Sequence, residues 1–258
     1  MKLYGALLLV IGVCAAPLAC AQWIHYPTRG IPRTADGKAD LAAPTPRTTD
    51  GKPDLSGLWE HDNPLKYLSN IAADIGELPM TPWGEQLYNQ RLANHGADDP
   101  NGFCMPSGPV EKHAVPAPFK ILQVPDLLVI VYESRTIFRQ IHLDSRPFPE
   151  DPQPAWDGYS VGRWEGDALV VESMGFNGKL WLDGRGHPSS DAMHVTERFR
   201  RPSFGKLEVE ITVDDPKAYT KPWTVKQTMH YLPDSELIEH ACEENNKAPE
   251  EIGGVAPQ

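Results

Sequence analysis

Residues 159–176 read YSVGRWEGDALVVESMGF, and this stretch sets the fold class of the C-terminal half of the chain. Its two flanks are rich in branched and aromatic residues, which suit a pleated, half-buried strand. Between them stands Glu165-Gly166-Asp167, where Gly166 can take the positive φ that a tight hairpin turn needs. The stretch therefore predicts a β-hairpin, and the rest of the chain can be interpreted outward from it.

Runs with strand character occur on both sides of this hairpin, separated by turn signals. They cover residues 120–124, 127–134, 136–144, 194–200, 206–213, 224–232 and 237–242. Strands at this spacing, without helices between them, predict a mainly β fold. We expect an antiparallel meander that forms a lipocalin-like (calycin-like) barrel or a sandwich. Gly57-Leu58-Trp59, at the start of the first strand, also suggests a lipocalin-like barrel, although three residues are a weak motif.

The segment before the barrel, residues 22–56, is predicted to be an extended N-terminal arm. It holds two copies of one motif, PRTADGKADL at 32–41 and PRTTDGKPDL at 46–55, offset by 14 residues. The Asp-Gly in each copy is a turn signal. One short helix is expected near 82–93, because Thr81 can cap it and Pro82 suits the first helical position.

The first 21 residues have the layout of a secretory signal peptide. A basic start precedes an apolar run and the small-x-small sequence Ala19-Cys20-Ala21, so cleavage would leave Gln22 first. A lipoprotein with Cys20 lipidated is the alternative, and Pro17 disfavours it. The apolar run is too short for a good membrane span. The predicted location is periplasmic or secreted.

Export brings an oxidising compartment, and Cys104 and Cys242 are the two cysteines outside the signal peptide. We expect them to form a disulfide, with two separate buried thiols as the alternative. The whole chain carries a net charge of −11, which argues against nucleic acid as a partner. After the barrel domain at 57–247, residues 248–258 are expected to form a flexible tail.

Several of these segments resemble a large family of secreted bacterial proteins. The matching segments are DGKPDLSGLW at 50–59, GYSVGRWEGDALVVE at 158–172, HVTERFRR at 194–201, DDPKAYTKPW at 214–223 and CEEN at 242–245. Proteins of this family often carry Asp-Gly-Arg-x-His-Pro where this chain has DSRPFP at 144–149. The resemblance implies secretion and a β fold, and it implies no activity.

Arg139 is the most unusual residue of the predicted strands. It stands between Ile137 and Ile141 on what should be the buried face of strand 136–144, and a buried guanidinium is costly unless it is paired. One interpretation is an internal ion pair with a carboxylate such as Glu197 or Glu133. The other is an anchor for an anion or carbonyl group of a ligand inside the barrel.

Two histidines follow carboxylates in one polar segment, as Asp183 with His187 and Asp191 with His194. Such pairs can form a general base with an orienting partner. Zinc binding by the two histidines is the alternative, but the spacing fits no zinc motif, so no metal is expected. The simplest interpretation is a loop in which the two aspartates cap turns.

His194 has the stronger functional case, because it begins a predicted strand. We expect its side chain and that of Arg139 to share one polar pocket with Tyr159 or Asp144 nearby. The candidate catalytic residues are thus His194, Asp144 and Tyr159.

Aromatic residues at the strand ends suggest the walls of a cavity. The candidate ligand-binding residues are Arg139, Trp156, Trp181, Tyr219 and Trp223. The sequence contains no phosphate-binding glycine loop, and Gly158-Tyr159-Ser160-Val161-Gly162 lies in the predicted hairpin, not at the strand-to-helix turn that a nucleophile elbow requires.

The first hypothesis is a secreted β-barrel that binds a small organic ligand in an aromatic-lined cavity, without a cofactor. One alternative is an acid/base enzyme, such as a lyase, hydratase or isomerase, that uses the same cavity. The other is a partner-binding module that uses the extended arm. A cavity with a histidine–carboxylate contact would favour the enzyme.

Overall fold

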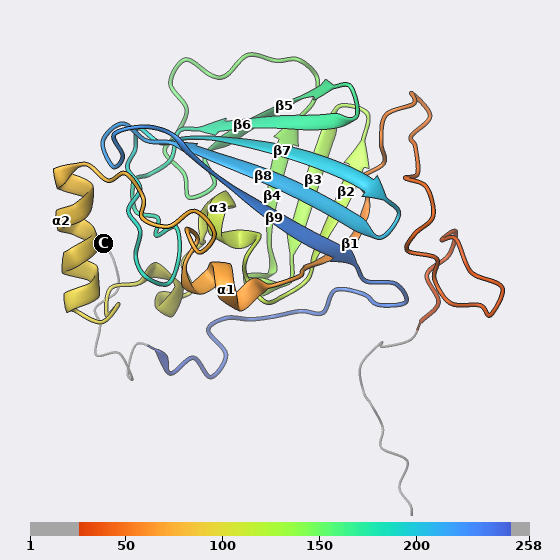
Figure 1. Ribbon diagram of the computed structural model, residues 1–258, viewed down its shortest axis with the longest axis horizontal. Helices are drawn as coiled ribbons and strands as arrows, with labels where there is room; N and C mark the ends of the chain where they lie inside the picture. Colours follow the sequence, from red (N-terminus) through yellow and green to blue (C-terminus); the bar gives the residue numbers. More distant parts are fainter. Residues whose placement is uncertain (1–25, 249–258) are drawn as a thin grey trace, which may run out of the picture.

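The structure, a computed structural model, describes residues 26–248. Within these residues nine strands form one closed barrel, and the order of the strands around it follows the chain (Figure 1). The predicted mainly β fold is confirmed, and the architecture is the barrel and not the sandwich. The predicted signal peptide, residues 1–21, lies outside the described residues, as does most of the predicted tail.

The strands match the sequence prediction closely. They are β1 (Gly57–His61), β2 (Phe119–Val124), β3 (Leu127–Tyr132), β4 (Ile137–His142), β5 (Tyr159–Glu165), β6 (Ala168–Met174), β7 (His194–Ser203), β8 (Lys206–Asp214) and β9 (Trp223–Tyr231). The predicted hairpin at 159–176 is β5–β6, in which Glu165 pairs with Ala168 around the predicted turn. The prediction of a strand at 237–242 is wrong, because that segment pairs with no strand within residues 26–248.

One junction of the barrel departs from a simple meander. Neighbouring strands pair antiparallel everywhere except between β4 and β5, which run parallel and share one pair, His142 with Val161. The long loop between these strands, residues 143–158, brings the chain back so that β5 starts at the same end as β4. Because β4 and β5 share only one backbone pair, side-chain contacts hold these two strands together where a ladder of hydrogen bonds does so elsewhere.

Short helices cover the barrel, and only α2 (Pro82–Ala93) is predicted from the sequence. The Thr81 side chain accepts a hydrogen bond from the Gly84 amide and caps α2 as expected. The other segments are α1 (Pro64–Ser69), η1 (Pro100–Phe103), α3 (Gly108–Lys112) and η2 (Ser134–Thr136). They are too short to show the periodicity from which a helix is recognised.

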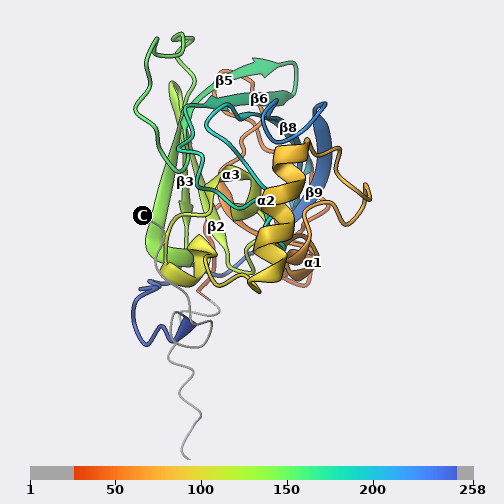
Figure 2. The ribbon, with the colours of Figure 1, turned by 90° about the vertical axis from the view of Figure 1, so that its left-hand side faces the viewer.

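Two ends of the barrel are covered by different parts of the chain. The N-terminal arm lies beside one end and α2 beside the opposite end (Figure 1), and α2 stands in front of the strands when its end faces the viewer (Figure 2). At the arm end, the Arg201 guanidinium lies 4.8 Å from the ring centroid of Trp59 and donates to the carbonyls of Asp54 and Ser56. This stack fills the lumen beneath the Gly-x-Trp motif.

The two repeats of the arm fold into the same turn. Gly37 and Gly51 have positive φ, and each amide donates to a threonine carbonyl three residues earlier at 2.9 Å. Arg47 pairs with Asp167 at the turn of the β5–β6 hairpin. The repeat thus forms two successive turns that hold the arm against the barrel.

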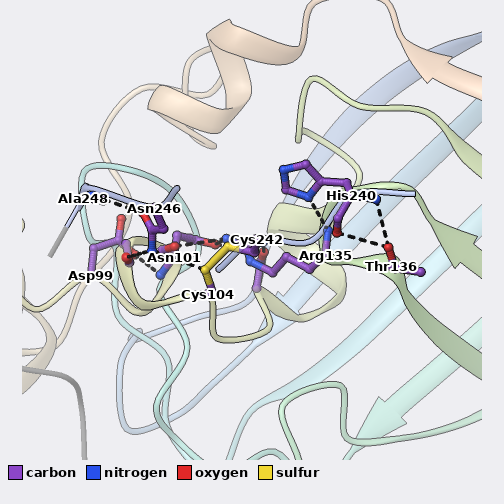
Figure 3. The surroundings of a disulfide bond; sticks show 11 residues. Asp99, Asn101, Cys104, Arg135, Thr136, His240, Cys242, Asn246 and Ala248 are labelled. Atoms are coloured by element: carbon purple, nitrogen blue, oxygen red, sulfur yellow. Dashed lines mark hydrogen bonds between the residues drawn. A yellow bond between two sulfur atoms is a disulfide. The ribbon is translucent and has the colours of Figure 1, made fainter. Parts of the chain in front are cut away.

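The segment after β9 crosses the outside of the barrel and is fixed by a disulfide. Cys104, which follows η1, is bonded to Cys242, so the predicted bridge is present (Figure 3). Nearby, the His240 carbonyl accepts a hydrogen bond from the Thr136 hydroxyl at 3.1 Å. Residues 233–248, which we call the C-terminal strap, are thereby tied to η1 and η2. Among the described residues, no helix combines the length and apolarity needed to span a membrane.

Candidate functional site

Arg139 lies in the lumen and is fully engaged there. Its side chain is buried, and the guanidinium pairs with the Glu197 carboxylate of β7. It also donates to the Ser173 hydroxyl at 2.9 Å and to the Ser160 hydroxyl at 3.2 Å. These contacts span β4 to β7 and bridge the β4–β5 junction. The internal ion pair is therefore the observed arrangement, and protein groups occupy the guanidinium that the alternative interpretation assigned to a ligand.

The pocket expected to join Arg139 and His194 is not formed. Glu197 faces the lumen from β7, and His194, three residues earlier, falls on the outer face of that strand. Arg139 and His194 thus lie on opposite faces of the sheet. The prediction assumed that a strand start after a polar loop would face inward, and the alternation along β7 shows the reverse.

The two other candidate catalytic residues lie together on the outside of the barrel. Asp144 forms an exposed ion pair with Arg146, whose guanidinium reaches the Tyr159 hydroxyl at 3.3 Å. The Tyr159 ring stacks on His142 with a centroid distance of 5.1 Å. Asp144 and Tyr159 are therefore close to each other, but neither lies in the lumen with Arg139.

Three of the candidate aromatic residues are buried side chains of the polar loops and β9. The Trp223 and Tyr219 rings meet edge to face at 5.4 Å, and the Tyr219 hydroxyl donates to the Pro188 carbonyl. Trp181 carries the Arg91 guanidinium on its face at 4.6 Å. Trp156 is only partly buried and packs against the core. These aromatic side chains pack against other parts of the protein more than they line an open cavity.

A histidine–carboxylate contact is present, and it belongs to the other predicted pair. The Asp183 carboxylate accepts the His187 Nδ1 hydrogen at 2.5 Å. Asp183 is fully buried and also accepts the Ile71 amide at 2.8 Å and the Arg185 amide at 3.0 Å. Because an ionised carboxylate only accepts hydrogen bonds, Nδ1 carries the proton. His187 Nε2 therefore bears the lone pair, and no described residue hydrogen-bonds to it.

Helix α2 holds His187 in place from the other side. Gly84, Tyr88 and Arg91 fall on one face of the helix, at the spacing of its turns. The Tyr88 ring stacks on the His187 ring at 4.6 Å with an interplanar angle of 12°. Arg91 donates to the Gly186 carbonyl at 3.0 Å. A Cβ at Gly84 would lie 2.4 Å from the Ala218 carbonyl oxygen, so glycine permits this close approach.

His187 opens onto a cleft of about 640 Å³ between α2, the segment after α1 and the 183–188 turn. Its walls are mostly polar, and we call it the α2 cleft. Its lining residues are Asn70, Ala72, Ala73, Gly76, Glu77, Leu78, Pro79, Met80, Glu85, Tyr88, Asn89, Arg185 and His187. The volume falls within the range of small-molecule sites. Within residues 26–248, no three His, Cys, Asp or Glu side chains are grouped as a metal site would require.

The arrangement at His187 can move a proton. A buried carboxylate fixes the tautomer and orientation of the imidazole and stabilises its protonated form, as in acid/base sites generally. The sequence contained this signal in Asp183 and His187, four residues apart. The contribution of Tyr88 could not be found there, because no local pattern connects α2 to the 183–188 turn.

Helix α3 brings a buried acid close to the strap. Glu111 is 1% exposed, and its two oxygens accept hydrogen bonds from the Asn101 amide group at 2.8 and 2.9 Å. Burial raises the pKa of Glu111 to about 8 from an ordinary value of 4.5. The folded protein therefore holds this carboxyl group protonated at pH values where the unfolded chain has released the proton.

This shift predicts a pH dependence of stability. A raised folded-state pKa contributes stability below the unfolded pKa, and the contribution is lost as the pH rises towards about 8. The free energy of unfolding should fall with a slope of up to about 1.4 kcal/mol per pH unit across that window. Urea unfolding of Glu111→Gln between these pH values should show a flatter profile. The exposed variant Glu85→Gln is the control, and equal slopes for both variants would contradict the assignment.

Comparison with known proteins assigns this chain to no family. The chain matches no protein-family model and no curated protein. Among solved structures, it is similar to a mutant of the fluorescent protein UnaG, at 16% sequence identity over 70% of this chain and 97% of that one. The TM-score of that match is 0.31, which carries no argument about ligand or activity. The barrel assignment rests on the closed strand topology itself.

Proposed function

We propose that the protein binds a small polar organic molecule in the α2 cleft and that His187 acts on it as a general base. The observation that carries this proposal is the 2.5 Å contact between buried Asp183 and Nδ1 of His187, a residue that lines the cleft. The enzyme hypothesis drawn from the sequence required such a contact inside the barrel. The same chemistry is proposed here for a cleft outside it.

The lining of the cleft limits the reaction class. Among the described residues that line it there is no Ser, Thr, Cys or Lys side chain, so a covalent intermediate would require a carboxylate, Tyr88 or His187 itself as the nucleophile. Glu77, Glu85 and Arg185 supply charge, and Asn70 and Asn89 supply amide groups. Proton transfer by His187 to and from a bound polar molecule is therefore the supported chemistry. Elimination, hydration and isomerisation are the reactions that need only such a step.

The cleft can be tested separately from the base. Asn89 lines the cleft from α2, whereas Gln86 is exposed on the same helix and does not line it. In a saturation-transfer NMR screen of small polar organic acids and polyols, compounds that bind the natural protein should fail to bind Asn89→Trp and still bind Gln86→Trp. If every bound compound binds both tryptophan variants equally, the α2 cleft is not the site.

His187 has a prediction of its own. His187→Gln keeps a polar side chain at the cleft and removes the basic nitrogen, so binding should persist within a few-fold while turnover of a bound compound is lost. Asp183→Asn should lower turnover by about 10⁴-fold through the wrong tautomer, as the equivalent change does in serine-protease triads. Product formation by the natural protein and by His187→Gln at equal rates would contradict the assigned role.

We also propose that the protein is exported to the periplasm or to the medium. The signal-peptide layout of residues 1–21 and the disulfide between Cys104 and Cys242 support it. N-terminal analysis of the exported protein should give Gln22 as the first residue. An intact Met1, or a lipid on Cys20, would contradict this processing.

A further inference from the structure

The lumen contains a polar level that the α2 cleft does not explain. Because barrel strands are tilted and offset, the pairing register groups lumen-facing residues into levels along the axis. At one of these levels, seven of the nine strands have a polar side chain that faces the lumen. The other two strands, β2 and β8, have Phe119 and Val209 at this level. These residues, which we call the polar belt, are His61, Tyr132, Arg139, Ser160, Ser173, Glu197 and Gln227.

One half of the polar belt is satisfied internally. Arg139, Ser160, Ser173 and Glu197 hydrogen-bond to one another, as described above. His113, which directly follows α3, enters the lumen and contacts Glu197 through Nε2 at 2.8 Å. Since the Glu197 carboxylate only accepts, Nε2 of His113 carries the proton and Nδ1 is an acceptor.

The other half of the polar belt offers unpaired groups. Within the described residues, His113 Nδ1, His61 Nε2, the Tyr132 hydroxyl and both polar atoms of the Gln227 amide are buried without a partner. Each of these four side chains is 4% exposed or less. His61 Nδ1 accepts the Asn63 amide at 2.8 Å, so its Nε2 is a donor. Donors and acceptors therefore stand at one level of the lumen.

So many unpaired polar groups, buried at one level of the lumen, indicate that they hydrogen-bond to a bound molecule. A folded protein leaves few such groups, because each has lost its water without gaining a hydrogen bond. Here they gather beside aromatic walls, since the His113 ring lies 5.7 Å from the rings of both Phe119 and Phe199. A structural network alone would pair them with one another, as the Arg139 half does.

We propose that the open half of the polar belt is a buried binding site for a small neutral molecule that presents a hydrogen-bond donor and an acceptor side by side, as an amide does. The Gln227 amide matches such a group with its own adjacent donor and acceptor. His61 supplies a further donor and His113 a further acceptor. This site is separate from the α2 cleft and does not depend on the function proposed there.

The charge of the ligand follows from its surroundings. Burial, the largest cause, lowers the pKa of His61 to about 4, so His61 is neutral at physiological pH. Burial raises the pKa of Tyr132, which keeps its hydroxyl neutral. Arg139 and Glu197 neutralise each other. An ion would enter this level without a counter-charge, and a neutral molecule enters without that cost.

The test uses a graded series of neutral probes, formamide, acetamide and benzamide, against formate, acetate and benzoate. At saturating concentration, at least one amide should raise the unfolding temperature of the natural protein, and the matching carboxylates should not. Gln227→Leu should weaken amide binding by about tenfold or more. Thr228→Val, on the outer face of the same strand, should leave the affinity unchanged.

Each other outcome overturns the proposal. If no amide of the series stabilises the natural protein, the open half holds water or nothing. If an amide binds Gln227→Leu as tightly as the natural protein, it binds elsewhere. If Gln227→Leu does not fold, His61→Phe removes a donor from the same level and should give the same loss. Amide binding that disappears in Asn89→Trp would belong to the α2 cleft instead.

Discussion

Replacing Glu197 with leucine is expected to lower the free energy of unfolding by about 3–5 kcal/mol. The change removes the only charge that compensates Arg139 among its described contacts, at a place where both side chains are essentially inaccessible to water. It also leaves Ser160 and Ser173 holding a guanidinium across the parallel β4–β5 junction. Urea unfolding at neutral pH, followed by tryptophan fluorescence, measures the loss.

The double variant Arg139→Met with Glu197→Leu separates charge from packing. Replacing a whole buried ion pair with apolar residues is often neutral or stabilising, so the double variant should recover most of the loss. Glu210→Leu, on the outer face of β8, is the surface control and should change stability by about 0.5 kcal/mol or less. A double variant as unstable as Glu197→Leu alone would show that the pair is not the source of the effect.

The same pair predicts how acid unfolds the barrel. Burial alone would raise the pKa of Glu197, but Arg139 and His113 outweigh it and bring the pKa to about 2. A lowered folded-state pKa contributes stability above the unfolded value, near 4.5, and this contribution is lost as the pH falls towards 2. Glu111 acts in the opposite direction at higher pH, so stability should be greatest in weakly acidic solution.

The barrel could be predicted from sequence because its signals are local. Alternation along strands such as β4 and a turn glycine in the β5–β6 hairpin act within a few residues. The same alternation predicted that Arg139 is buried, and of the two carboxylates suggested as its partner, Glu197 and Glu133, the structure pairs it with Glu197. The segment 237–242 shows the limit, since its apolar residues are held by the disulfide and by hydrogen bonds to η2, and not by a ladder.

The α2 cleft could be predicted only in part, because it is assembled from distant segments. Asp183 and His187 are neighbours in sequence and can be recognised as a pair. Tyr88 reaches them from a helix nearly a hundred residues earlier, through contacts that no local pattern encodes. The prediction that His194 is catalytic depends on its position at the start of a strand. A shift of one residue along β7 would move such a side chain from one face of the sheet to the other. For residues at strand ends, the sequence alone predicts least well whether a side chain faces the lumen or the outside of the barrel.

Removing the disulfide with Cys104→Ser and Cys242→Ser is expected to lower the free energy of unfolding by about 4–5 kcal/mol on the chain-entropy model. The bridge joins residues 138 positions apart, so it confines most of the barrel in the unfolded chain. The loss should appear as a lower urea midpoint with a steeper dependence on urea, because the unfolded chain becomes less compact.

The strap offers a way to tell this global effect from a local one. Without the bridge, residues 233–248 are still held to η1 and η2 by hydrogen bonds of His240 with Thr136 and Arg135 and by the Asn246 contact with Gly102 (Figure 3). If the bridge acts on the whole fold, the double-serine variant loses stability by tryptophan fluorescence. If it acts on the strap alone, brief proteolysis cuts only residues 233–248 and the urea midpoint stays the same. The second result would place the effect of the bridge in the folded protein, since an unfolded-chain constraint cannot be confined to one segment.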